Sequence, residues 1–353
     1  MEWYRLRIIG LKDSIIAKLM LHFEKYNDIF LLDKELLKLY FKFDDETISL
    51  IYQSKKTNLE KELTFFKEKN INIISLKDKN YPINLKNISH PPLFLYYKGD
   101  ISIANEKTIG IVGTRRPTTY GKRVCEKITT DLVKSQVTIV SGLALGIDAI
   151  SHKTTLENNG KTIAVVGSGL DIIYPRENKR YWEEIGEKGL LISEFPLGTE
   201  PLSYNFPMRN RIIVGLSKGI VVVESKEKGG SLITASLALE EGRDVFAIPG
   251  DIYSPVSTGT NNLIKNSEAK LITSSEDILK EFNWPIKESN KINLNLSEDE
   301  LKIYNILEKE KSLDELIIIT GIKAKILLAI LMEMEINGYI LSISGGKYIR
   351  KIK

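Results

Sequence analysis

The sequence predicts an α/β protein with a parallel-sheet core, a helical domain before the core and a winged-helix domain after it. Three patterns in the 353 residues support this division. Residues 107–282 alternate short apolar runs with helical patterns, residues 1–69 show helical spacing alone, and residues 296–353 show three helices followed by a hairpin. Two or three domains are expected at this length, because single cores rarely grow beyond about 250–300 residues.

The core contains short apolar runs rich in β-branched residues, each followed by a turn and then a helical pattern. The runs are TIGIV (108–112), VTIV (137–140), TIAVV (162–166), LLIS (190–193), GIVVV (219–223), DVFAI (244–248) and KLIT (270–273). This alternation is typical of a parallel sheet with helices on both faces. We therefore assign residues 70–282 to an extended Rossmann-like core, whose ligands should bind at the carboxyl ends of the strands.

The first 69 residues are expected to form a small helical domain. Asp13 or Ser14 should cap the first of its main helices, and Asp33 should cap the second. The helical spacing covers Ser14–Phe23, Leu31–Tyr40 and Leu59–Lys69.

Residues 80–100 form a proline-rich, aromatic connector between this domain and the first core strand. Its prolines argue against a helix. Its apolar run, Leu93–Tyr97, predicts that it packs on the core.

A polar linker, residues 283–295, precedes the winged-helix domain of residues 296–353. Two capping boxes, a third helix and a hairpin mark that domain: Ser297 with Glu300, Ser312 with Glu315, Lys323–Asn337, and Tyr339–Ser342 with Lys347–Ile352. The third helix is apolar over Ile326–Met332 and is expected to be buried on most sides. A helix that reads base edges in a duplex needs polar side chains, so packing or protein contact is favoured over duplex-DNA regulation.

Composition limits the classes of function. The formal net charge is only +4, so any basic site must be local. Cys125 is the single cysteine, which excludes an intrachain disulfide and a four-cysteine zinc site and fits a reducing compartment. The sequence has no signal-peptide pattern and no apolar stretch long enough to span a membrane, so we expect a cytoplasmic protein.

The first core strand ends in Gly113, and Arg115 and Arg116 follow it directly. A glycine at this point lets a ligand approach the backbone, and guanidinium groups donate bidentate hydrogen bonds to phosphate. Pro117 favours extended backbone at Arg116, so the two arginines should point to opposite faces. Only one of the two is then expected to face the site.

The second core strand leads into Ser141 and Gly142 and then a helix start, a combination suited to anions. On that helix, Asp148 and His152 are four residues apart and share a face. They could act as an acid–base pair, but a hydrogen bond that fixes the helix is the favoured interpretation. No cluster of metal-ligand spacing is present, so no metal is expected.

Basic and aromatic residues follow the third strand, a combination that suits a single nucleic-acid strand because charge tracks the backbone and rings stack on bases. The alternative is a solvated helix start with a core tryptophan. The basic residues are Arg176, Lys179 and Arg180, and the aromatic residues are Tyr174, Tyr181 and Trp182.

Two later strand ends add further candidates. Arg209 and Arg211 enter an amphipathic helix after the fourth strand, and Gly229, Gly230 and Ser231 open a helix after the fifth. Glycines at a helix start form a phosphate cradle. Because no strand end carries a nucleophile–base pair and no Walker loop is present, these parts indicate binding without catalysis and without a cofactor.

The motifs GTRRPTTYG, SGLALGIDAISH, GSGLDIIYPREN, FPMRNRIIVGLS, GGSLITASLALEEGRDVFAIPGD and GTNNLIKNSEAKLI occur in order over about residues 70–282. This series resembles the DNA-processing protein A (Smf) family. The flanking domains are similar to that family's sterile-alpha-motif-like and winged-helix domains.

The resemblance implies a homodimer that binds and protects single-stranded DNA and loads a RecA-type recombinase during natural transformation. It also implies that DNA contacts Arg115, Ser141 with Gly142, the basic residues after Tyr174, Arg209 with Arg211, and Gly229 with Gly230.

An enzyme is the main alternative, since the core also resembles the lysine-decarboxylase-like nucleotide phosphoribohydrolases. Their motif is Pro-Gly-Gly-x-Gly-Thr-x-x-Glu. Here Lys228 replaces the proline, and no glutamate follows until Glu240. Without that carboxylate, the glycosidic-bond chemistry has no obvious agent, so non-catalytic binding is favoured.

Overall fold

The computed structural model describes residues 1–286 and 296–351. The chain divides into two compact units, Met1–Ile286 and Lys287–Lys353, which are described separately below. The first unit contains both the N-terminal helices and the α/β core. Within the described residues, no helix has the length and apolar character needed to cross a membrane.

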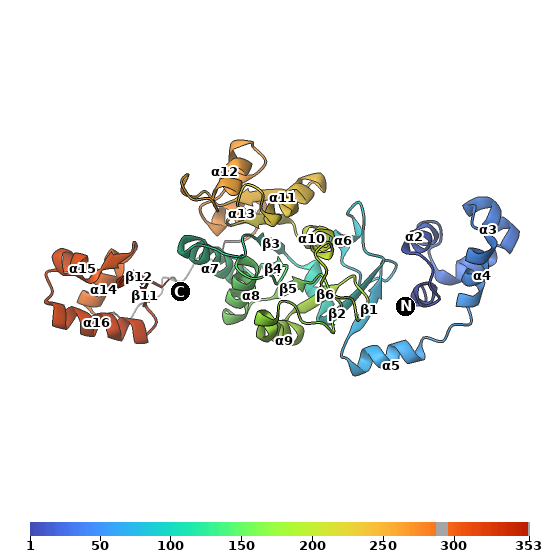
Figure 1. Cartoon of the computed structure of the whole chain (residues 1–353), viewed down its shortest axis with the longest axis horizontal. Coiled ribbons are helices and arrows are strands. Elements are labelled where there is room, and N and C mark those ends of the chain that lie inside the picture. Colours follow the sequence, from blue (N-terminus) through green and yellow to red (C-terminus); the bar gives the residue numbers. More distant parts are fainter. Residues whose placement is uncertain (287–295, 352–353) are drawn as a thin grey trace. The chain divides into compact units, whose positions relative to one another are not determined.

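The core is a nine-stranded sheet, counted over the described residues, in the order β1-β2-β6-β5-β4-β3-β7-β8-β9. Figure 1 labels the part of this sheet from β1 to β3. The strands from β3 onward are parallel and coincide with the apolar runs of the sequence, which confirms the predicted core. Their bounds are β3 Thr108–Val112, β4 Thr138–Ser141, β5 Thr162–Val165, β6 Leu190–Ser193, β7 Gly219–Val222, β8 Asp244–Ala247 and β9 Lys270–Leu271.

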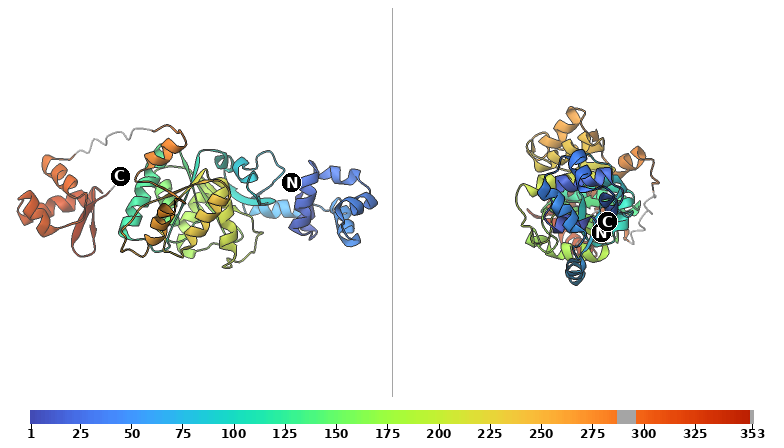
Figure 2. Two further views of the ribbon diagram at one scale, coloured as in Figure 1. Left: turned by 90° about the horizontal axis from the view of Figure 1, so that it is seen from above. Right: turned by 90° about the vertical axis from the view of Figure 1, so that its right-hand side faces the viewer.

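Side chains that alternate along the strands build a core on each face of the sheet. Ile109 and Ile111 of β3 pack with one set of helices, while Val112 packs with the other. The first set includes α7 (Thr119–Lys134), α8 (Ile147–Glu157) and α13 (Ser275–Glu281). The second set includes α6 (Ile83–Lys86), α10 (Asn205–Leu216), α11 (Gly230–Glu240) and α12 (Thr258–Lys265). Figure 2 shows this layered arrangement from above.

The N-terminal helices pack beside the β1–β2 edge of the sheet (Figures 1 and 2). The Tyr4 and Tyr96 hydroxyls lie 2.9 Å apart, and the Tyr4 ring packs edge-on against Phe94. The helices are α1 Tyr4–Ile8, α2 Asp13–His22, η1 Tyr26–Leu31, α3 Lys34–Phe41, α4 Asp45–Ser54 and α5 Glu60–Glu68.

The predicted caps of these helices are partly confirmed. The Asp33 carboxylate accepts the backbone N–H of Leu36 at 2.8 Å and caps α3 as predicted. The predicted cap of α2 is wrong. Its N-cap residue is Lys12, without a side-chain cap, because the Asp13 carboxylate pairs with the Arg7 guanidinium instead.

The proline-rich connector packs on the core as predicted, but the exclusion of helix is wrong. It carries α6, whose N-cap is Pro82, a place where a missing N–H costs nothing. Buried Phe94–Tyr96 belong to β2 (Phe94–Gly99), which pairs antiparallel with β1 (Asn72–Ser75) and with β6. A one-turn 3₁₀ helix, η2 (Ile101–Asn105), then leads to β3.

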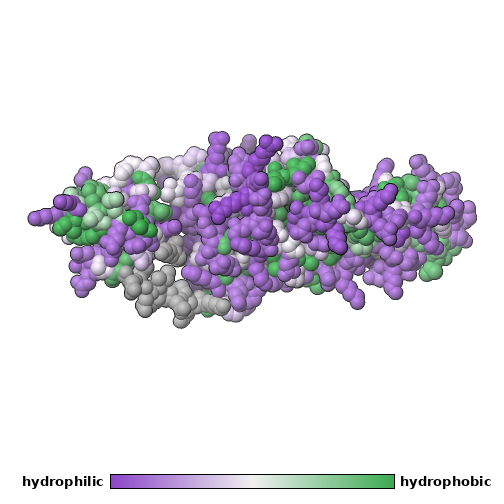
Figure 3. All heavy atoms as spheres, turned by 90° about the horizontal axis from the view of Figure 1, so that it is seen from below, coloured by the Kyte–Doolittle hydropathy of each residue, from purple (hydrophilic) through white to green (hydrophobic). Residues whose placement is uncertain are grey.

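The C-terminal unit has the predicted winged-helix pattern, and both capping boxes are present. Its elements are α14 Glu298–Ile306, β10 Lys311–Ser312, α15 Leu313–Thr320, α16 Ala324–Ile336, β11 Ile340–Ile343 and β12 Lys347–Arg350. The expectation that the third helix is buried on most sides is wrong. Leu327 and Leu331 of α16 are buried, but Met332 is 62% exposed because one helix face suffices for so small a core. Apolar surface is visible on this unit in Figure 3.

The predicted linker begins later than expected. The Trp284 ring stacks on Phe282 with centroids 4.8 Å apart, and both rings pack against the core. Residues 287–295, the rest of the predicted linker, lie outside the described residues.

Candidate functional site

A cavity of about 680 Å³ lies at the carboxyl ends of the central strands, and we call it the strand-end cavity. The chain runs outward from β3 through β4 and β5 to β6, then returns to β7 on the other side of β3. This reversal is the topological switch point, where α/β folds place their ligands. The lining includes Arg115, Arg116, Asp148, Tyr174, Phe206, Arg209, Asn210, Lys226, Lys228, Gly229, Gly230 and Ser231.

The loop that carries the two arginines is held in place by Glu224, the residue after β7 and Val223. The Thr114 N–H donates to the Glu224 carbonyl at 2.8 Å, and the Thr118 N–H donates to its carboxylate at 2.9 Å. Thr118 Oγ1 donates to the same carboxylate at 2.5 Å. A side chain at Gly121 would place Cβ 2.3 Å from this carboxylate, so glycine is needed there. The loop therefore presents Arg115 and Arg116 on a fixed backbone.

The expectation that only one arginine of the pair faces the site is wrong. Arg115 and Arg116 are both exposed and both line the strand-end cavity. The loop curves around the end of β3, so the alternation of extended backbone does not separate them. Arg115 differs because it also lines a small enclosed extension of about 40 Å³ together with Gly142 and Tyr174.

Arg209 is buried, at 4% exposure, and its guanidinium is already engaged. Nη1 donates to the carbonyl of Gly142 at 2.8 Å and to the carbonyl of Val165. Burial lowers the pKa of Arg209 to about 10, although the neighbouring Asp148 carboxylate raises it. Arg209 thus ties the ends of β4 and β5 together, and this role differs from the direct DNA contact predicted for it.

Asp148 and His152 bond to different partners, which does not support an acid–base pair. The Gly142 N–H donates to the Asp148 carboxylate at 3.1 Å, and burial raises the pKa of Asp148 against the effect of Arg209. His152 Nδ1 lies 2.7 Å from Thr162 Oγ1, and burial lowers the pKa of His152 to about 3. Both side chains fix the helix to the sheet, although not through the mutual contact that the sequence suggested.

Ser141 and Gly142 separate in the structure. The Ser141 hydroxyl is buried and donates to the Ile111 carbonyl at 2.6 Å, so it holds β4 to β3. Gly142 lines the small extension, where a side chain would place Cβ 2.5 Å from Arg209 Nη2. Of this pair, only Gly142 reaches the candidate site.

The start of α11 lies in the cavity as predicted. Gly229 is its N-cap, where a Cβ would lie 2.2 Å from Ser225 Oγ, whereas Gly230 has open space beside it. The Ser231 hydroxyl donates to Ser225 Oγ at 2.9 Å. An eleven-residue helix directs its partial positive charge into the cavity here.

Two exposed lysines, Lys226 and Lys228, line the cavity between β7 and α11. Neither was among the predicted site residues, although the strand-end rule that selected Gly229 would also have found them. The cavity therefore holds four exposed cations, and Asp148, its one lining carboxylate, is offset by Arg209.

Aromatic rings line one side of the same cavity. The Tyr174 and Phe206 rings pack with centroids 5.5 Å apart, and Tyr174 is 41% exposed. The neighbouring cations Arg176, Lys179 and Arg180 are exposed on η3 (Arg176–Asn178) and α9 (Lys179–Lys188) but do not line the cavity. Trp182 is buried in the core, in agreement with the alternative reading of that motif.

Arg211 lies apart from the other predicted residues. Its guanidinium pairs with the Glu194 carboxylate, and both side chains line a second cavity on the other face of α10. Over the described residues, no group of three or more His, Cys, Asp or Glu side chains could hold a metal ion.

This fold and site define a Rossmann-like protein with a basic cavity at its switch point. The model of the DNA recombination-mediator protein A family matches residues 72–283, and that of the DprA winged-helix domain matches residues 289–346. The chain therefore belongs to the DNA processing protein A (DprA/Smf) family.

Individual relatives agree with this assignment. The chain is 39% identical to DNA processing protein DprA of Streptococcus pneumoniae over 294 residues, which cover 80% of this chain and 98% of that protein. It is 47% identical to the Bacillus subtilis protein over 225 residues, 64% of this chain and 75% of that one.

Two solved structures resemble this one. The S. pneumoniae protein matches with a TM-score of 0.68 and 36% identity, over 81% of this chain and 99% of that one. The Helicobacter pylori protein, whose structure describes a single-stranded DNA binding mode, matches with a TM-score of 0.56 and 30% identity, over 61% of this chain and 97% of that one.

Proposed function

We propose that this protein binds and protects single-stranded DNA and loads a RecA-type recombinase onto it during natural transformation, as a cytoplasmic homodimer. The observation that carries the DNA-binding part is the set of four exposed cations in the strand-end cavity, at the switch point of the sheet. The single-stranded DNA binding mode described for the H. pylori relative supports the same ligand. The recombinase and dimer parts rest on family membership.

A single strand suits the strand-end cavity better than a duplex. The cations lie in a cavity at the carboxyl ends of the central strands, beside the Tyr174 and Phe206 rings. Unpaired bases could stack on the faces of these rings. A duplex would instead need a protruding element that enters a groove.

The DNA contacts divide into three groups. Arg115 should be the principal phosphate contact, supported by Arg116, Lys226, Lys228 and the N–H groups at Gly230 and Ser231. Gly142 should allow close approach, while Ser141 and Arg209 position the loops. The exposed residues Arg176, Lys179 and Arg180 should guide the strand outside the cavity.

The test is a fluorescence-anisotropy titration with single-stranded and blunt duplex oligonucleotides at several salt concentrations. We expect preference for the single strand and a salt dependence with a slope of roughly −0.7 per phosphate contact. Equal affinity for both forms at moderate salt would contradict the proposal.

We also propose that the protein does not turn over nucleotides. Glu240, the first glutamate after the Gly-Gly motif, is the last residue of α11 and does not line the cavity, and the Asp148 carboxylate is buried. Nucleoside monophosphates and labelled strands should therefore stay intact on incubation. Base release that follows protein concentration through repurification would favour the phosphoribohydrolase alternative.

A further inference from the structure

A second cavity, of about 1150 Å³, lies beside the strand-end cavity, and we call it the β6 cavity. Glu194, one of its lining residues, follows directly after β6, whose carboxyl end lies at the same sheet edge as those of β5, β4 and β3. On α10, Met208 and Arg211 line this cavity, whereas Arg209 and Asn210 line the strand-end cavity. One helix is thus a wall of both cavities.

The walls of the β6 cavity are mainly apolar, and they come from α2, the connector, the loop after β6 and α10. The apolar lining residues include Met20, Leu21, Leu76, Pro91, Pro92, Leu93, Phe195, Pro196 and Met208. The volume slightly exceeds that of a typical small-molecule pocket, about 300–1,000 Å³. A ligand of this cavity must therefore bury apolar surface.

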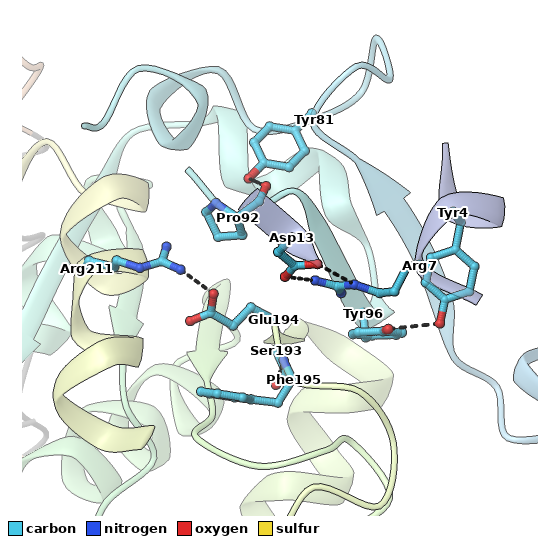
Figure 4. A network of polar contacts seen from close by, with 10 residues as sticks. All are labelled: Tyr4, Arg7, Asp13, Tyr81, Pro92, Tyr96, Ser193, Glu194, Phe195 and Arg211. Atoms are coloured by element: carbon cyan, nitrogen blue, oxygen red, sulfur yellow. Dashed lines mark hydrogen bonds and ion pairs between the residues drawn. The ribbon is translucent and has the colours of Figure 1, made fainter. Parts of the chain in front are cut away.

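Two ion pairs lie within this apolar lining, Arg211 with Glu194 and Arg7 with Asp13 (Figure 4). They leave hydrogen-bonding capacity unused. Within the described structure, Arg7 Nη1, Arg211 Nη1 and Glu194 Oε1 are buried and have no hydrogen-bond partner. Such atoms are costly and call for an explanation. A small rotation of these side chains would offer a ligand two donors and one acceptor.

Phe195, the residue after Glu194 in the loop that follows β6, also lines the cavity and places an aromatic ring near these ion pairs (Figure 4). Its side chain is half-buried, and its backbone N–H donates to Ser193 Oγ at 3.1 Å, which fixes the residue. The Phe94 ring, in contrast, is covered by the Arg7 guanidinium at 4.7 Å. Phe195 is therefore the ring available for stacking.

We infer that the β6 cavity binds an unstacked nucleobase of the same strand whose phosphates occupy the strand-end cavity, an inference that rests on the proposed single-strand binding. The base stacks on Phe195, and its polar edge meets Arg211 and Glu194. A nucleobase edge presents donors and acceptors side by side and so satisfies both partners. An acidic side chain could pair with Lys18, Lys77 or Lys86, which also line the cavity, but an ionised carboxylate offers no donor for Glu194 Oε1. The shared wall, α10, places the cavity next to the strand.

The experiment compares two ligands of equal length, an oligothymidylate and an abasic deoxyribose-phosphate strand. Phe195→Leu keeps an apolar side chain but removes the ring face, so it should weaken oligothymidylate binding by about tenfold. It should leave abasic-strand binding unchanged, because that ligand has no base to stack. Phe65→Leu, at an exposed ring on α5, is the matched control and should leave both affinities unchanged.

Three results would overturn the inference: parental affinity of Phe195→Leu for oligothymidylate, an equal loss on both ligands, or an equal loss in the Phe65→Leu control. Arg115→Ala separates this inference from the proposed function, because it should weaken binding of both ligands. If Arg115→Ala does so while Phe195→Leu has no effect, only the β6 cavity assignment fails. If the parent protein binds neither ligand, the proposed function fails.

A crosslinking experiment with the unmodified protein avoids any folding defect of a variant. A strand carrying iodouracil is irradiated on the protein, and the attachment points are located by tandem mass spectrometry. Crosslinks at Phe195 or Met208 are expected. Crosslinks confined to rings of the strand-end cavity, such as Tyr174, would overturn the inference.

Discussion

The strand-end cavity and the β6 cavity share α10 as a wall but differ in how their charges are arranged. In the first, four exposed cations face the opening, and the single carboxylate is buried against Arg209. In the second, Arg7 and Arg211 are each paired with a carboxylate among apolar walls. Free cations suit phosphates, whereas ion pairs with unused donors and acceptors in apolar surroundings suit a neutral, polar-edged ring. The kind of ligand that a site suits therefore depends less on the number of its arginines than on whether each arginine already has a partner.

The largest effect on DNA binding should come from Arg115→Ala. Arg115 lines both the strand-end cavity and its enclosed extension, on a backbone held by Glu224. We expect a loss of about 1.5–3 kcal/mol, since charge-assisted hydrogen bonds to phosphate are lost. Anisotropy titration of folded protein, checked by circular dichroism, measures it.

Arg116→Ala and Arg115→Lys are the matched controls. Arg116 lines the strand-end cavity but not its small extension, so it should contribute less to the affinity. Lysine at position 115 should restore binding only in part, because an ammonium group lacks the planar fork of a guanidinium. Parental affinity of Arg115→Ala combined with failure of Arg116→Ala would reverse the assignment.

Acid should lower the stability of the fold through His152, which is buried on α8. The ordinary histidine pKa is 6.5, and burial lowers that of His152 to about 3. Between these two pH values His152 is protonated in the unfolded chain but not in the folded chain, so the free energy of unfolding falls as the pH falls. From about pH 7 to pH 5, the loss should be about 2 kcal/mol. Denaturant unfolding of the parent and of His152→Gln over this range should show the slope in the parent alone.

Glu194, in the β6 cavity, should have the opposite effect on how folding stability depends on pH. Burial raises its pKa despite the nearby Arg211, so the folded chain holds this proton more tightly than the unfolded chain does. Acidification through the raised pKa should therefore favour folding at this residue. Glu194→Gln should remove that contribution and steepen the acid loss. Identical pH slopes in the parent, His152→Gln and Glu194→Gln would contradict both assignments.

A smaller effect is expected from Glu224→Gln. The amide is similar in shape but loses the charge-assisted bonds that the Thr118 N–H and hydroxyl donate. Strand affinity should fall by about 1 kcal/mol because the Arg115 loop is held less firmly. Ser236→Ala, at an exposed residue of α11, is a control that should not change the affinity. A Glu224→Gln protein with parental affinity would show that the loop needs no such support.

The smallest effect should follow removal of the C-terminal unit. A chain that ends at Ile286 keeps both cavities and the Phe282–Trp284 stack. It should bind single strands within about tenfold of the parent, that is, within about 1.4 kcal/mol. A greater loss of affinity, measured in the same titration, would indicate that the winged helix is part of the binding site.

The fold was predictable because hydrophobic periodicity reflects burial directly. Each buried strand from β3 to β8 appears in the sequence as an apolar run. The errors have local causes. Pro82 was taken to exclude a helix but is the N-cap of α6, and the apolar side chains of α16 exceed what its small core can bury.

Only those residues of the candidate site that directly follow a core strand could be predicted from the sequence. Strand ends located Arg115 and Gly229, but they could not reveal which arginines already had partners. Arg209 and Arg211 are two residues apart, yet helical geometry directs them to different cavities, and both meet oxygen atoms from segments distant in sequence. Only the folded chain brings Val165 and Glu194 to them.

The fixed loop around Arg115 has a kinetic consequence. Because Glu224 holds it at Thr114 and Thr118, the loop loses little freedom when DNA arrives, and its contact should act mainly on residence time. Lys226 and Lys228 are exposed at the edge of the same cavity, where charge accelerates encounter and is screened by salt. We therefore expect Lys226 and Lys228 to set how quickly a single strand is captured, and Arg115 to set how long it is held.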